Sequence, residues 1–409
     1  MRYILAILVC ILFLPAFVLA DGDTLILLGR STEMYHIYSV SAYNKNAFVA
    51  DADWGIRVIN YSDPYNPYTL TRYTEPALDI EIRDSLAYYV GFDVSNVGAL
   101  YIRDILNPLE SEIVGSAPLF RGFRLHLFEN LVLAMFKSPW EYVYLNILDI
   151  SDPTNPETLS TWITVPPYST AHWGDVWKRS NYIYWIDREY YPDAGKIAVF
   201  DITDPTEPIP IVVDTCLQST AHAIWIKNNY AYVALGKTYE VDYGGLMVLD
   251  ISDPYSIDSI GFFEIPGKSA INVCIKGKYA YVSVQEGGIY VLDITNPINP
   301  TLVTYYDSPG ISKDVFVDEP YVLVADYTSL LVFEASFLSN VPGDANNDKQ
   351  VNISDVVYLI DYLFKSGLEP TNSDLADVNA DCKIDLGDVV HLINYLYKNG
   401  PAPQMGCVE

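Results

Sequence analysis

The chain has 409 residues, of which 50% are hydrophobic and only 19% are charged. This balance supplies enough apolar surface for a packed interior and excludes a mainly disordered chain. Acidic residues outnumber basic residues by 52 to 24, and the resulting net charge of −28 argues against nucleic acid or an anionic lipid surface as the partner.

The first twenty residues predict a secretory signal peptide. Residues 1–20 carry one charged side chain, Arg2, followed by an apolar run that ends at Ala20. A basic start, a hydrophobic centre and a small residue at the cleavage position are typical of such peptides. Cys10 leaves a lipoprotein anchor as a minor alternative, although Val9 is not the small residue that such a site prefers. No later apolar run reaches the roughly 20 residues of a membrane helix, so we expect a secreted, extracellular or cell-surface protein without membrane insertion.

A pattern of short strands and turns repeats through most of the remaining chain, and its clearest copy is Gly287–Gly310. An acidic or amide residue recurs every 41 to 52 residues near the end of the third strand of each copy. This position is Asn60, Asp104, Asp149, Asp201, Asp250, Asp293 and Glu334. A period of about 40–50 residues with four short strands is typical of a β-propeller blade, because one such sheet buries its faces only against neighbouring sheets. The Asp-Pro and Asn-Pro pairs predict tight turns between the third and fourth strands, with the Asp or Asn side chain bonded to the turn backbone.

The number of copies predicts a mainly β fold with seven blades, with six or eight as the alternatives. The seventh copy leaves the pattern after Glu334 and lacks its outer strand, whereas Thr24–Gly29 reads as an outer strand that belongs to no other copy. We therefore expect Thr24–Gly29 to complete the last blade and to close the ring. The repeats resemble the LVIVD-repeat propellers, a family named for the strand present here as Tyr290–Asp293. This resemblance implies the fold of residues 21–337 but no activity, because the family is largely without assigned chemistry.

The segment after a short linker, residues 338–342, contains two copies of a twelve-residue acidic loop. Oxygen-bearing side chains occupy positions 1, 3, 5, 9 and 12, namely Asp344, Asn346, Asp348, Asn352 and Asp355, and then Asp377, Asn379, Asp381, Asp385 and Asp388. Calcium takes six to eight oxygen ligands, and this spacing lets one loop surround the ion. The position-7 backbone carbonyls of Gln350 and Lys383 complete each predicted set. The sequence therefore predicts two bound calcium ions.

Each acidic loop leads into a segment with helical periodicity, and residues 343–409 resemble a type I dockerin. This resemblance implies a small all-α module that plugs into a cohesin-like domain and in some bacteria attaches enzymes to a cell-surface scaffold. Aspartate at position 12 agrees with dockerins. Position 6 departs from the pattern, since Lys349 and Cys382 stand where glycine usually takes a left-handed conformation, at a cost of roughly 1–2 kcal/mol.

Positions 10 and 11 of the loops commonly set the choice of partner in dockerins. Here they are Ile353, Ser354, Leu386 and Gly387, which differ from the hydroxyl pair of the best-known members. Because the two helices are near copies, two docking orientations are expected. The alternative is that the module only caps the propeller.

Four cysteines remain after the predicted cleavage. Cys382 and Cys407 both lie in the C-terminal module, and the sequence leaves open whether they pair. Cys216 and Cys274 fall in different repeats, so we expect free buried thiols at these two positions.

Polar residues near the starts of the predicted inner strands converge on the central channel of the ring. The ligand candidates are Asp79, Arg124, Asp175, His222, Asn272 and Asp314. Such a ring of polar groups can hold a ligand, a metal or ordered water, and mutual hydrogen bonding is the simplest interpretation. No HExxH, GxSxG, P-loop or dinucleotide motif is present, so we predict no catalytic residues.

Three longer connections, residues 137–142, 187–193 and 237–243, place Tyr and Trp beside carboxylates. Exposed aromatic rings suit sugar stacking or a protein interface, and packing between blades is the alternative.

These features together predict a secreted propeller that binds a protein or an extracellular glycan and is attached through its dockerin. A propeller glycoside hydrolase or polysaccharide lyase is the main alternative, and a structural surface-layer component is a third. Two carboxylates about 5–10 Å apart in an open cleft would favour hydrolysis, whereas a filled channel would favour binding.

Overall fold

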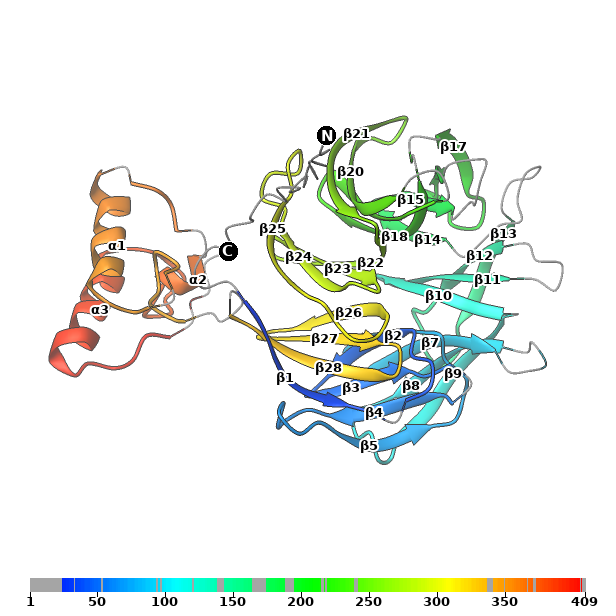
Figure 1. Cartoon of the computed structure of the whole chain (residues 1–409), viewed down its shortest axis with the longest axis horizontal. Helices are drawn as coiled ribbons and strands as arrows, with labels where there is room; N and C mark the ends of the chain where they lie inside the picture. Colours follow the sequence, from blue (N-terminus) through cyan, green and yellow to red (C-terminus); the bar gives the residue numbers. More distant parts are fainter. Residues whose placement is uncertain are drawn as a thin grey trace, which may run out of the picture.

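The computed structural model describes the chain from residue 24 to residue 406 with short gaps. The described residues are 24–32, 34–52, 54–92, 95, 98–119, 121–137, 143–163, 174–187, 195–214, 217, 219–238, 242–336, 341–348, 350–365, 367–370, 373–404 and 406. Within them, strands form seven four-stranded antiparallel sheets arranged as a ring (Figure 1). The fold class predicted from the repeats is thereby confirmed. The predicted signal peptide and residues 338–340 of the predicted linker lie outside the described residues.

Six blades take their strands in chain order from the centre of the ring outward. Blade 1 contains β2 (Ser39–Tyr43), β3 (Asn46–Ala50), β4 (Ile56–Asn60) and β5 (Tyr68–Tyr73), and blade 2 contains β6 (Asp79–Arg83), β7 (Leu86–Phe92), β8 (Gly98–Asp104) and β9 (Glu112–Leu119). Blade 3 contains β10 (Arg121–Phe128), β11 (Leu131–Lys137), β12 (Val143–Asp149) and β13 (Glu157–Ile163), and blade 4 contains β14 (Asp175–Arg179), β15 (Tyr182–Asp187), β16 (Lys196–Asp201) and β17 (Ile209–Asp214). Blade 5 contains β18 (Thr220–Lys227), β19 (Tyr230–Gly236), β20 (Tyr243–Asp253) and β21 (Ser256–Pro266), and blade 6 contains β22 (Ser269–Lys276), β23 (Tyr279–Gln285), β24 (Gly288–Asp293) and β25 (Thr301–Tyr306).

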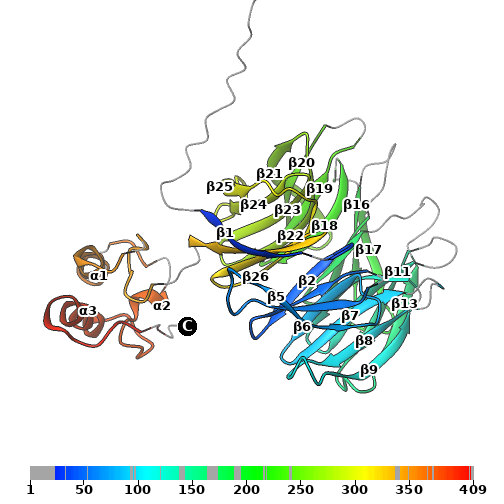
Figure 2. The same ribbon diagram turned by 60° about the horizontal axis from the view of Figure 1, so that its bottom comes forward.

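Blade 7 is built from both ends of the ring. Its inner strands are β26 (Ser312–Asp318), β27 (Tyr321–Asp326) and β28 (Ser329–Ala335), and its outer strand is β1 (Leu25–Ser31). The register pairs Leu25 with Ala335 and Ser31 with Leu330, and Figure 2 shows β1 lying along the yellow strands of this blade. The predicted closure by the N-terminal strand is confirmed, and the count of seven blades with it.

The turns between third and fourth strands use the chemistry that their sequences predict. The Asp149 carboxylate accepts the Ser151 N–H (2.7 Å), and the Asp201 carboxylate accepts the Thr203 N–H in the next blade (2.8 Å). The same bond joins Asp293 to Thr295 in blade 6 (2.8 Å). These side chains satisfy the backbone of the turn, as Asp does in Asx turns. In the Asp-Pro and Asn-Pro pairs, Asp152 accepts the Thr154 N–H at 2.9 Å and Asn296 accepts the Ile298 N–H at 3.2 Å, so the predicted bond to the turn backbone is confirmed there.

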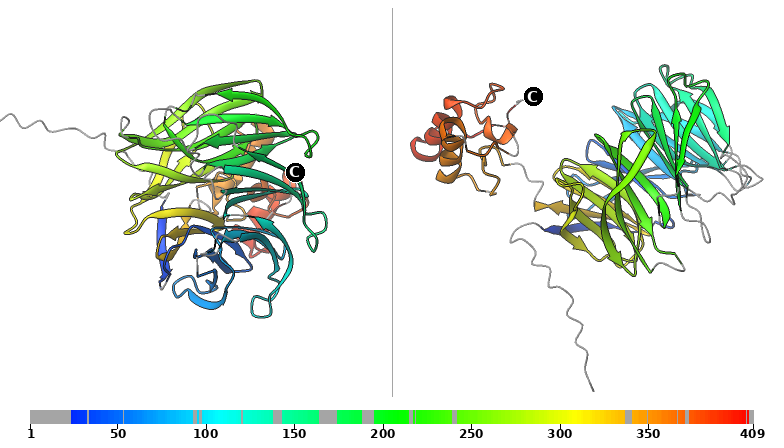
Figure 3. Two further views of the ribbon diagram at one scale, coloured as in Figure 1. Left: turned by 90° about the vertical axis from the view of Figure 1, so that its right-hand side faces the viewer. Right: turned by 90° about the horizontal axis from the view of Figure 1, so that it is seen from above.

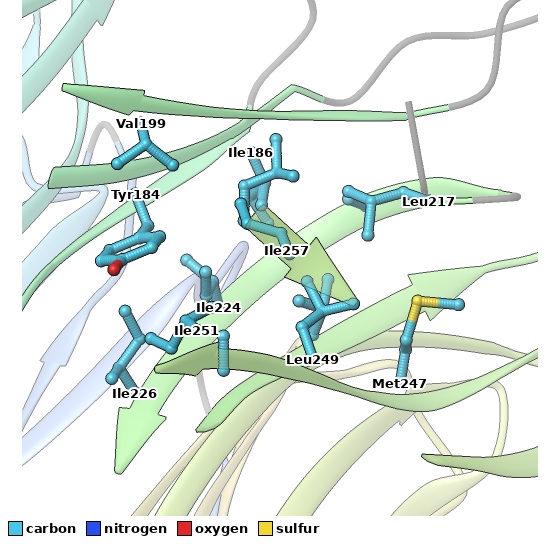
Figure 4. Packing of buried hydrophobic residues seen from close by; sticks show 14 of the residues in the cluster. Tyr184, Ile186, Val199, Leu217, Ile224, Ile226, Met247, Leu249, Ile251 and Ile257 are labelled. Atoms are coloured by element: carbon cyan, nitrogen blue, oxygen red, sulfur yellow. The ribbon is translucent and has the colours of Figure 1, made fainter. Parts of the chain in front are cut away.

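The core of the ring lies between blades. Seven clusters of buried apolar side chains occur in the described part of the ring, one at each interface between neighbouring blades. Figure 4 shows the cluster between blades 4 and 5, where Tyr184 and Ile186 face Ile224 and Leu249. Full burial of one such side chain contributes about 1.5–3 kcal/mol. Each blade is thus stabilised chiefly by its neighbours.

Strand direction defines two faces of the ring. Inner strands begin on what we call the front face, and because directions alternate, the connections between second and third strands lie there too. The connections between third and fourth strands lie on the opposite, back face. The third strand β28 therefore ends at Ala335 on the back face, where the chain leaves the ring. Figure 3 gives side views of this arrangement.

The C-terminal segment forms three helices, which Figures 1 and 3 show outside the ring. They are α1 (Ile353–Lys365), α2 (Ser373–Ala376) and α3 (Leu386–Lys398). Their small core contains Val356 and Leu359 from α1 and Val389 and Leu392 from α3. None of the described helices is long and apolar enough to cross a membrane.

Candidate functional sites in the channel and the acidic loops

The central channel brings together five of the six predicted ligand candidates. A cavity of about 470 Å³ is lined by Asp79, Arg124, Asp175, Asn272 and Asp314. The sixth candidate, His222, lines a second hollow of about 140 Å³ toward the front face, and Arg124 lines both. The sequence therefore located the channel-lining residues, and their individual contacts decide what they do.

The three aspartates tie neighbouring blades together. Asp79 accepts the Leu125 N–H (2.9 Å) and thereby joins blade 2 to blade 3. Asp175 accepts the Ile224 N–H (3.0 Å) and joins blade 4 to blade 5. The carboxylate of Asp314 accepts the Val40 N–H (2.8 Å) across the closure of the ring. Because each carboxylate replaces a missing strand partner, these contacts are structural.

Arg124 and Asn272 complete this layer of side chains. The Arg124 Nε lies 3.5 Å from Asp175 Oδ1, and its Nη1 lies 4.0 Å from Asp79 Oδ2. Asn272 donates its Nδ2 to Asp314 Oδ1 at 2.6 Å. Burial opposes the charge on Arg124, but the nearby carboxylates outweigh it and raise its pKa. These five side chains line the larger hollow, and Arg124 also lines the hollow toward the front face.

His126 holds the most constrained position in the channel. Its Nδ1 lies 2.6 Å from Glu81 Oε1, and its Nε2 lies 2.9 Å from Asp175 Oδ1. Burial alone would lower the pKa of His126, but Asp175 and Glu81 raise it to about 10. The ring is therefore an imidazolium at neutral pH, a form that cannot act as a general base. The sequence placed His126 near an inner strand start but missed Glu81, which lies two residues after Asp79 and so on the same face of β6.

The other titrating groups of the cavity follow from burial and neighbouring charge. Burial raises the pKa of Asp314 to about 6 and also raises the pKa of Asp79. Burial likewise opposes the charged form of Asp175, yet Arg124 and His126 lower its pKa below the ordinary value. Cys274 is a free cysteine whose pKa burial raises to about 12. Cys274 is free, as predicted, but it is partly rather than fully buried, and Cys216 lies outside the described residues.

The longer connections are only partly described. Residues 138–142, 188–193 and 239–241 of the predicted aromatic loops lie outside the described residues, and so does His172. Tyr243 begins β20 and packs beside Phe262, with 5.9 Å between ring centroids. An exposed aromatic pair that the sequence did not single out, Tyr35 and Trp54, lies on the front face instead.

The two acidic loops share one hydrogen-bond pattern. In the first, Asp344 Oδ1 and Asn346 Oδ1 both accept the Asp348 N–H, at 2.8 and 2.9 Å. In the second, Asp377 and Asn379 accept the Asp381 N–H at 3.1 and 3.0 Å. The matching bonds show that positions 1, 3 and 5 adopt the same arrangement in both copies.

The position-12 aspartates also cap helices. Asp355 accepts the N–H groups of Asn346 and Asn352 at 3.2 and 2.9 Å, and Asp388 accepts those of Asn379 and Asp385 at 3.3 and 2.8 Å. Asp385 and Asp388 form a capping box at the start of α3. The aspartate at position 12 therefore both closes the loop and caps the start of the helix.

The residues present fit calcium. Four aspartates at positions 1 and 12 are almost fully buried, with at most 1% of each residue exposed: Asp344, Asp355, Asp377 and Asp388. Burial raises the pKa of Asp355, and the neighbouring carboxylates of Asp344 and Asp348 add to this effect. Clustered buried carboxylates are costly unless a cation joins them. Within the described residues, no group of three acidic, histidine or cysteine side chains is arranged to hold a metal ion, and calcium also accepts amide and carbonyl oxygens as ligands.

Comparison with family models agrees with both halves of this description. The type I dockerin model matches residues 342–397, and the LVIVD repeat model matches residues 36–75, 142–164, 219–261 and 267–308. The chain contains LVIVD repeats within its seven-bladed propeller and a type I dockerin domain after it. Type I dockerins bind calcium, so calcium binding belongs to this chain, and a cohesin domain is the partner that the dockerin implies.

Solved structures support the propeller fold alone, because their sequence identities are low. A chain of the Mitotic Checkpoint Complex is 10% identical with a TM-score of 0.59, covering 82% of this chain and 99% of its own length. The WD40 β-propeller domain of Doa1 is 8% identical with a TM-score of 0.57, covering 76% and 97%. The computationally designed Ika8 protein is 13% identical with a TM-score of 0.52, covering 76% and 100%. Among curated proteins there is no match.

Backbone conformation in the dockerin loops agrees with the predicted strain. Cys382 at position 6 has φ 63°, the left-handed conformation that favours glycine. Asn347 and Ala380 at position 4 are also left-handed, with φ 61° and 58°, and Lys349 lies outside the described residues. Cys382 is disulfide-bonded. Cys407, the cysteine for which the sequence left pairing with Cys382 open, lies outside the described residues.

Positions 10 and 11 of the dockerin differ in what they present. Ile353 and Leu386 at position 10 are exposed by 50% and 55%. The Ser354 hydroxyl at position 11 is used within its loop, where it accepts from Asn346 Nδ2 at 2.8 Å. At Gly387 an added Cβ would lie 2.9 Å from the Asn379 side chain. Position 10 is therefore the more accessible of the two.

Proposed function

We propose that this protein is a secreted, non-catalytic binding module. Its propeller takes a protein or extracellular glycan ligand, and its dockerin attaches it to a cohesin-bearing partner or cell-surface scaffold. The observation that carries this proposal is the duplicated acidic loop, whose matched hydrogen bonds and buried aspartates prepare two equivalent helix starts. We take residues 1–20 as the signal peptide, 21–337 as the propeller and 343–409 as the dockerin.

Two calcium ions would be held by side-chain oxygens at positions 1, 3, 5, 9 and 12 and by the carbonyl at position 7 of each loop. These positions are Asp344, Asn346, Asp348, Gln350, Asn352 and Asp355, and Asp377, Asn379, Asp381, Lys383, Asp385 and Asp388. A bound cation supplies the positive charge that offsets the buried carboxylates. The chain's own residues then fix α1 and α3 relative to each other through the core that these helices share.

The docking surface would consist of matching exposed apolar residues on α1 and α3. The residues, with their exposed fractions, are Ile353 (50%), Val357 (48%) and Phe364 (65%) on α1, and Leu386 (55%), Val390 (48%) and Tyr397 (63%) on α3. Each α3 residue lies 33 positions after its α1 counterpart. Exposed apolar groups at equivalent positions support two docking orientations. Ser354 and Gly387 lie beside these surfaces.

The test is binding of the full-length chain to a panel of type I cohesin domains with calcium and with a chelator. We expect calcium-dependent binding to at least one of them. Replacing Asp344 and Asp377 together by alanine should abolish it, while Asp361→Ala, an exposed carboxylate outside both loops, should not. Calcium-independent binding, or none to any cohesin, would contradict attachment through the dockerin.

Binding is favoured over catalysis by the state of the channel. The three aspartates accept backbone N–H groups of the next blade, and His126 is held as an imidazolium between Glu81 and Asp175. Carboxylates and a histidine that are already paired suit a structural role better than hydrolysis. A reducing-sugar and unsaturated-product assay on a broad polysaccharide panel tests this, and reproducible turnover lost in Glu81→Gln would establish the enzyme alternative.

A further inference from the structure

A strip of aromatic residues crosses the front face of blades 7 and 1. It contains Tyr35, His36, Tyr38, Trp54 and Tyr327, with Arg72 and Lys313 beside the rings, and we call it the front strip. Tyr35, Trp54 and Tyr38 are exposed by 53%, 44% and 38%. Large rings are normally buried against neighbours, so three exposed rings in one place point to a binding surface.

One end of the front strip is a layered stack. The rings of Tyr35 and Trp54 lie 4.5 Å apart between centroids with an interplanar angle of 13°. Arg72 places its guanidinium carbon 5.5 Å from the Trp54 ring centroid. Although Trp54 covers part of Tyr35, more than half of the Tyr35 surface remains open. This end therefore presents a flat ring backed by a second ring and a cation.

The other end leads to the mouth of the channel. His36 lies 5.1 Å from Tyr327, and the Lys313 Nζ lies 5.9 Å from the Tyr38 ring and 5.8 Å from the Tyr327 ring. Tyr38 and Lys313 also line the 140 Å³ hollow at the front of the channel. Aromatic rings and nitrogen-bearing groups thus alternate along the strip.

The front strip is held in place by a buried carboxylate. Asp51, which is 0% exposed, accepts the N–H groups of Tyr35 and His36 at 3.0 and 2.9 Å. Its own backbone carbonyl accepts the Trp54 N–H at 2.8 Å. Arg57 lies 3.4 Å from the same carboxylate and balances its charge. Both ring-bearing segments are therefore fixed before any ligand arrives, which lowers the entropic cost of binding.

We propose that the front strip binds an uncharged polysaccharide, with sugar rings stacked on Tyr35 and Tyr38 and hydroxyl groups bonded by His36, Arg72 and Lys313. This inference rests on the proposed function and assigns its ligand and its site. A pyranose has an apolar face for a flat ring and hydroxyl groups around its rim, which matches the alternation in the strip. The net charge of −28 repels a polyanionic glycan.

Two further observations favour a polysaccharide over a protein. Lysine is depleted in the cores of protein interfaces, whereas Lys313 stands between the Tyr38 and Tyr327 rings. The chain also leaves the ring at Ala335 on the back face, so a scaffold-bound propeller presents the front strip away from its tether. A long polymer can lie across such a surface without entering the channel.

The experiment measures binding of the calcium-loaded full-length chain to cellulose, xylan, mannan, mixed-linkage glucan and polygalacturonate. We expect binding to at least one of the four uncharged polymers and none to polygalacturonate. Tyr35→Ala and Trp54→Ala should each weaken binding roughly tenfold, the effect of losing one aromatic contact. Tyr65→Ala and Tyr255→Ala are the matched controls, because both tyrosines are exposed, by 65% and 63%, in turns on the back face.

Tryptophan fluorescence gives a second readout that does not rely on the measured affinity. Ligand binding should change tryptophan fluorescence in the wild type, and this change should shrink in Trp54→Phe. Unchanged melting of the Tyr35→Ala variant would show that the ring stays folded.

Each of the other possible outcomes contradicts a specific part of the proposal. If the wild type binds an uncharged polymer and Tyr35→Ala binds equally well, the front strip is not the site, although the proposed function survives. Binding confined to polygalacturonate overturns the ligand class. Binding to none of the polymers overturns the inference, while cohesin binding still tests the dockerin separately.

Discussion

The propeller and the dockerin both bury aspartate, but they neutralise it in different ways. In the ring, Asp79, Asp175 and Asp314 accept backbone N–H groups from the next blade and lie near Arg124 or Asn272. In the dockerin, the buried aspartates lie beside further carboxylates, which raise the pKa of Asp355 and Asp388 together with burial. The ring thus supplies its own partners for buried charge, whereas the dockerin depends on a cation from solution.

The apolar cores differ in the same sense. Seven interfaces stabilise the ring, each with ten or more buried residues, whereas the dockerin has one cluster of seven. Small domains gain little from burial alone, so a bound ion matters more there. Two spectroscopic signals distinguish the two parts of the molecule. Tryptophan fluorescence reports on the propeller, because all seven tryptophans lie between residues 54 and 225. The helical circular dichroism signal reports on the dockerin, because the described α-helices lie after residue 352.

The largest effect is expected from opening the ring. Deleting residues 24–31 removes β1 and its pairing with β28, and with it the packing of Leu25 and Leu27 on the cluster between blades 6 and 7. The loss should be about 5 kcal/mol or more, from apolar burial and ladder hydrogen bonds together. Denaturant unfolding followed by tryptophan fluorescence measures it.

A matched pair of point variants sharpens that result. Leu27→Asp should lower the stability of the ring strongly, whereas Ile26→Asp should not, because Ile26 is 48% exposed on the other side of the same strand. Equal effects of the two substitutions would contradict the assigned register.

Calcium removal should affect the other half of the molecule. A chelator should abolish the helical circular dichroism signal of the dockerin while the tryptophan transition of the ring stays in place. Calcium at a thousand times its Kd contributes about 4 kcal/mol to a domain that binds it only when folded. Calorimetry should find two ions in the wild type and one in Asp344→Ala. A lower ring transition after chelation would show instead that the dockerin caps the propeller.

His126 should stabilise the ring in a pH-dependent way. Its folded pKa of about 10 exceeds the ordinary 6.5, so its contribution is fully present below pH 6.5 and is lost as pH rises through 10. His126→Phe should cost about 3–5 kcal/mol at pH 6, because Glu81 and Asp175 then lose their shared cation. Denaturant titrations at pH 6 and pH 10 measure this, and an equal cost at both values would rule out the imidazolium.

Asp314 should act in the same direction as His126, but in a lower pH window. Its folded pKa of about 6 lies above the ordinary 3.8, so the ring should gain stability as pH falls from about 6 toward 4, by about 1–3 kcal/mol. In Asp314→Asn this gain should disappear. The same titration of tryptophan fluorescence tests it.

The smallest effect is expected from one docking helix alone. Val357→Asp on α1 should change cohesin affinity by less than tenfold, because Val390 on α3 offers an equivalent surface. Val357→Asp combined with Val390→Asp should abolish binding. Loss in the single variant would show that only one orientation is used.

The sequence predicted the fold well because its evidence is local and repeated. The spacing from Asn60 to Glu334 follows the blade period. The predicted strand Thr24–Gly29 could fit only the last blade, which lacked its outer strand. The calcium loops are local for the same reason, since one twelve-residue stretch contains a whole ligand set. Their ligand roles remain predictions.

The channel contacts were harder to predict because they join residues one blade apart. Glu81 and Asp175 lie 45 and 49 positions from His126, and a strand's face must be combined with the blade period to find them. The Tyr35–Trp54 stack joins the connection before β2 to the connection between β3 and β4, and Asp51 of blade 1 bonds the backbone of both segments. The channel contacts are not visible within a single repeat, and the stack depends on turn geometry that strand patterning does not specify.

The closing strand has a mechanical consequence for a protein that is held by its C-terminus. The chain leaves the ring from β28, which is bonded to β27 on one side and to β1 on the other. Tension applied through the dockerin first reaches Ser336, whose N–H donates to the Thr24 carbonyl, and then Ala335, which pairs with Leu25 and donates to the Pro320 carbonyl. Two rows of hydrogen bonds therefore share the load from Ala335 onward. A strand at the rim of a blade would separate one hydrogen bond at a time, whereas β28 is bonded on both sides and so resists a pulling force on the C-terminus.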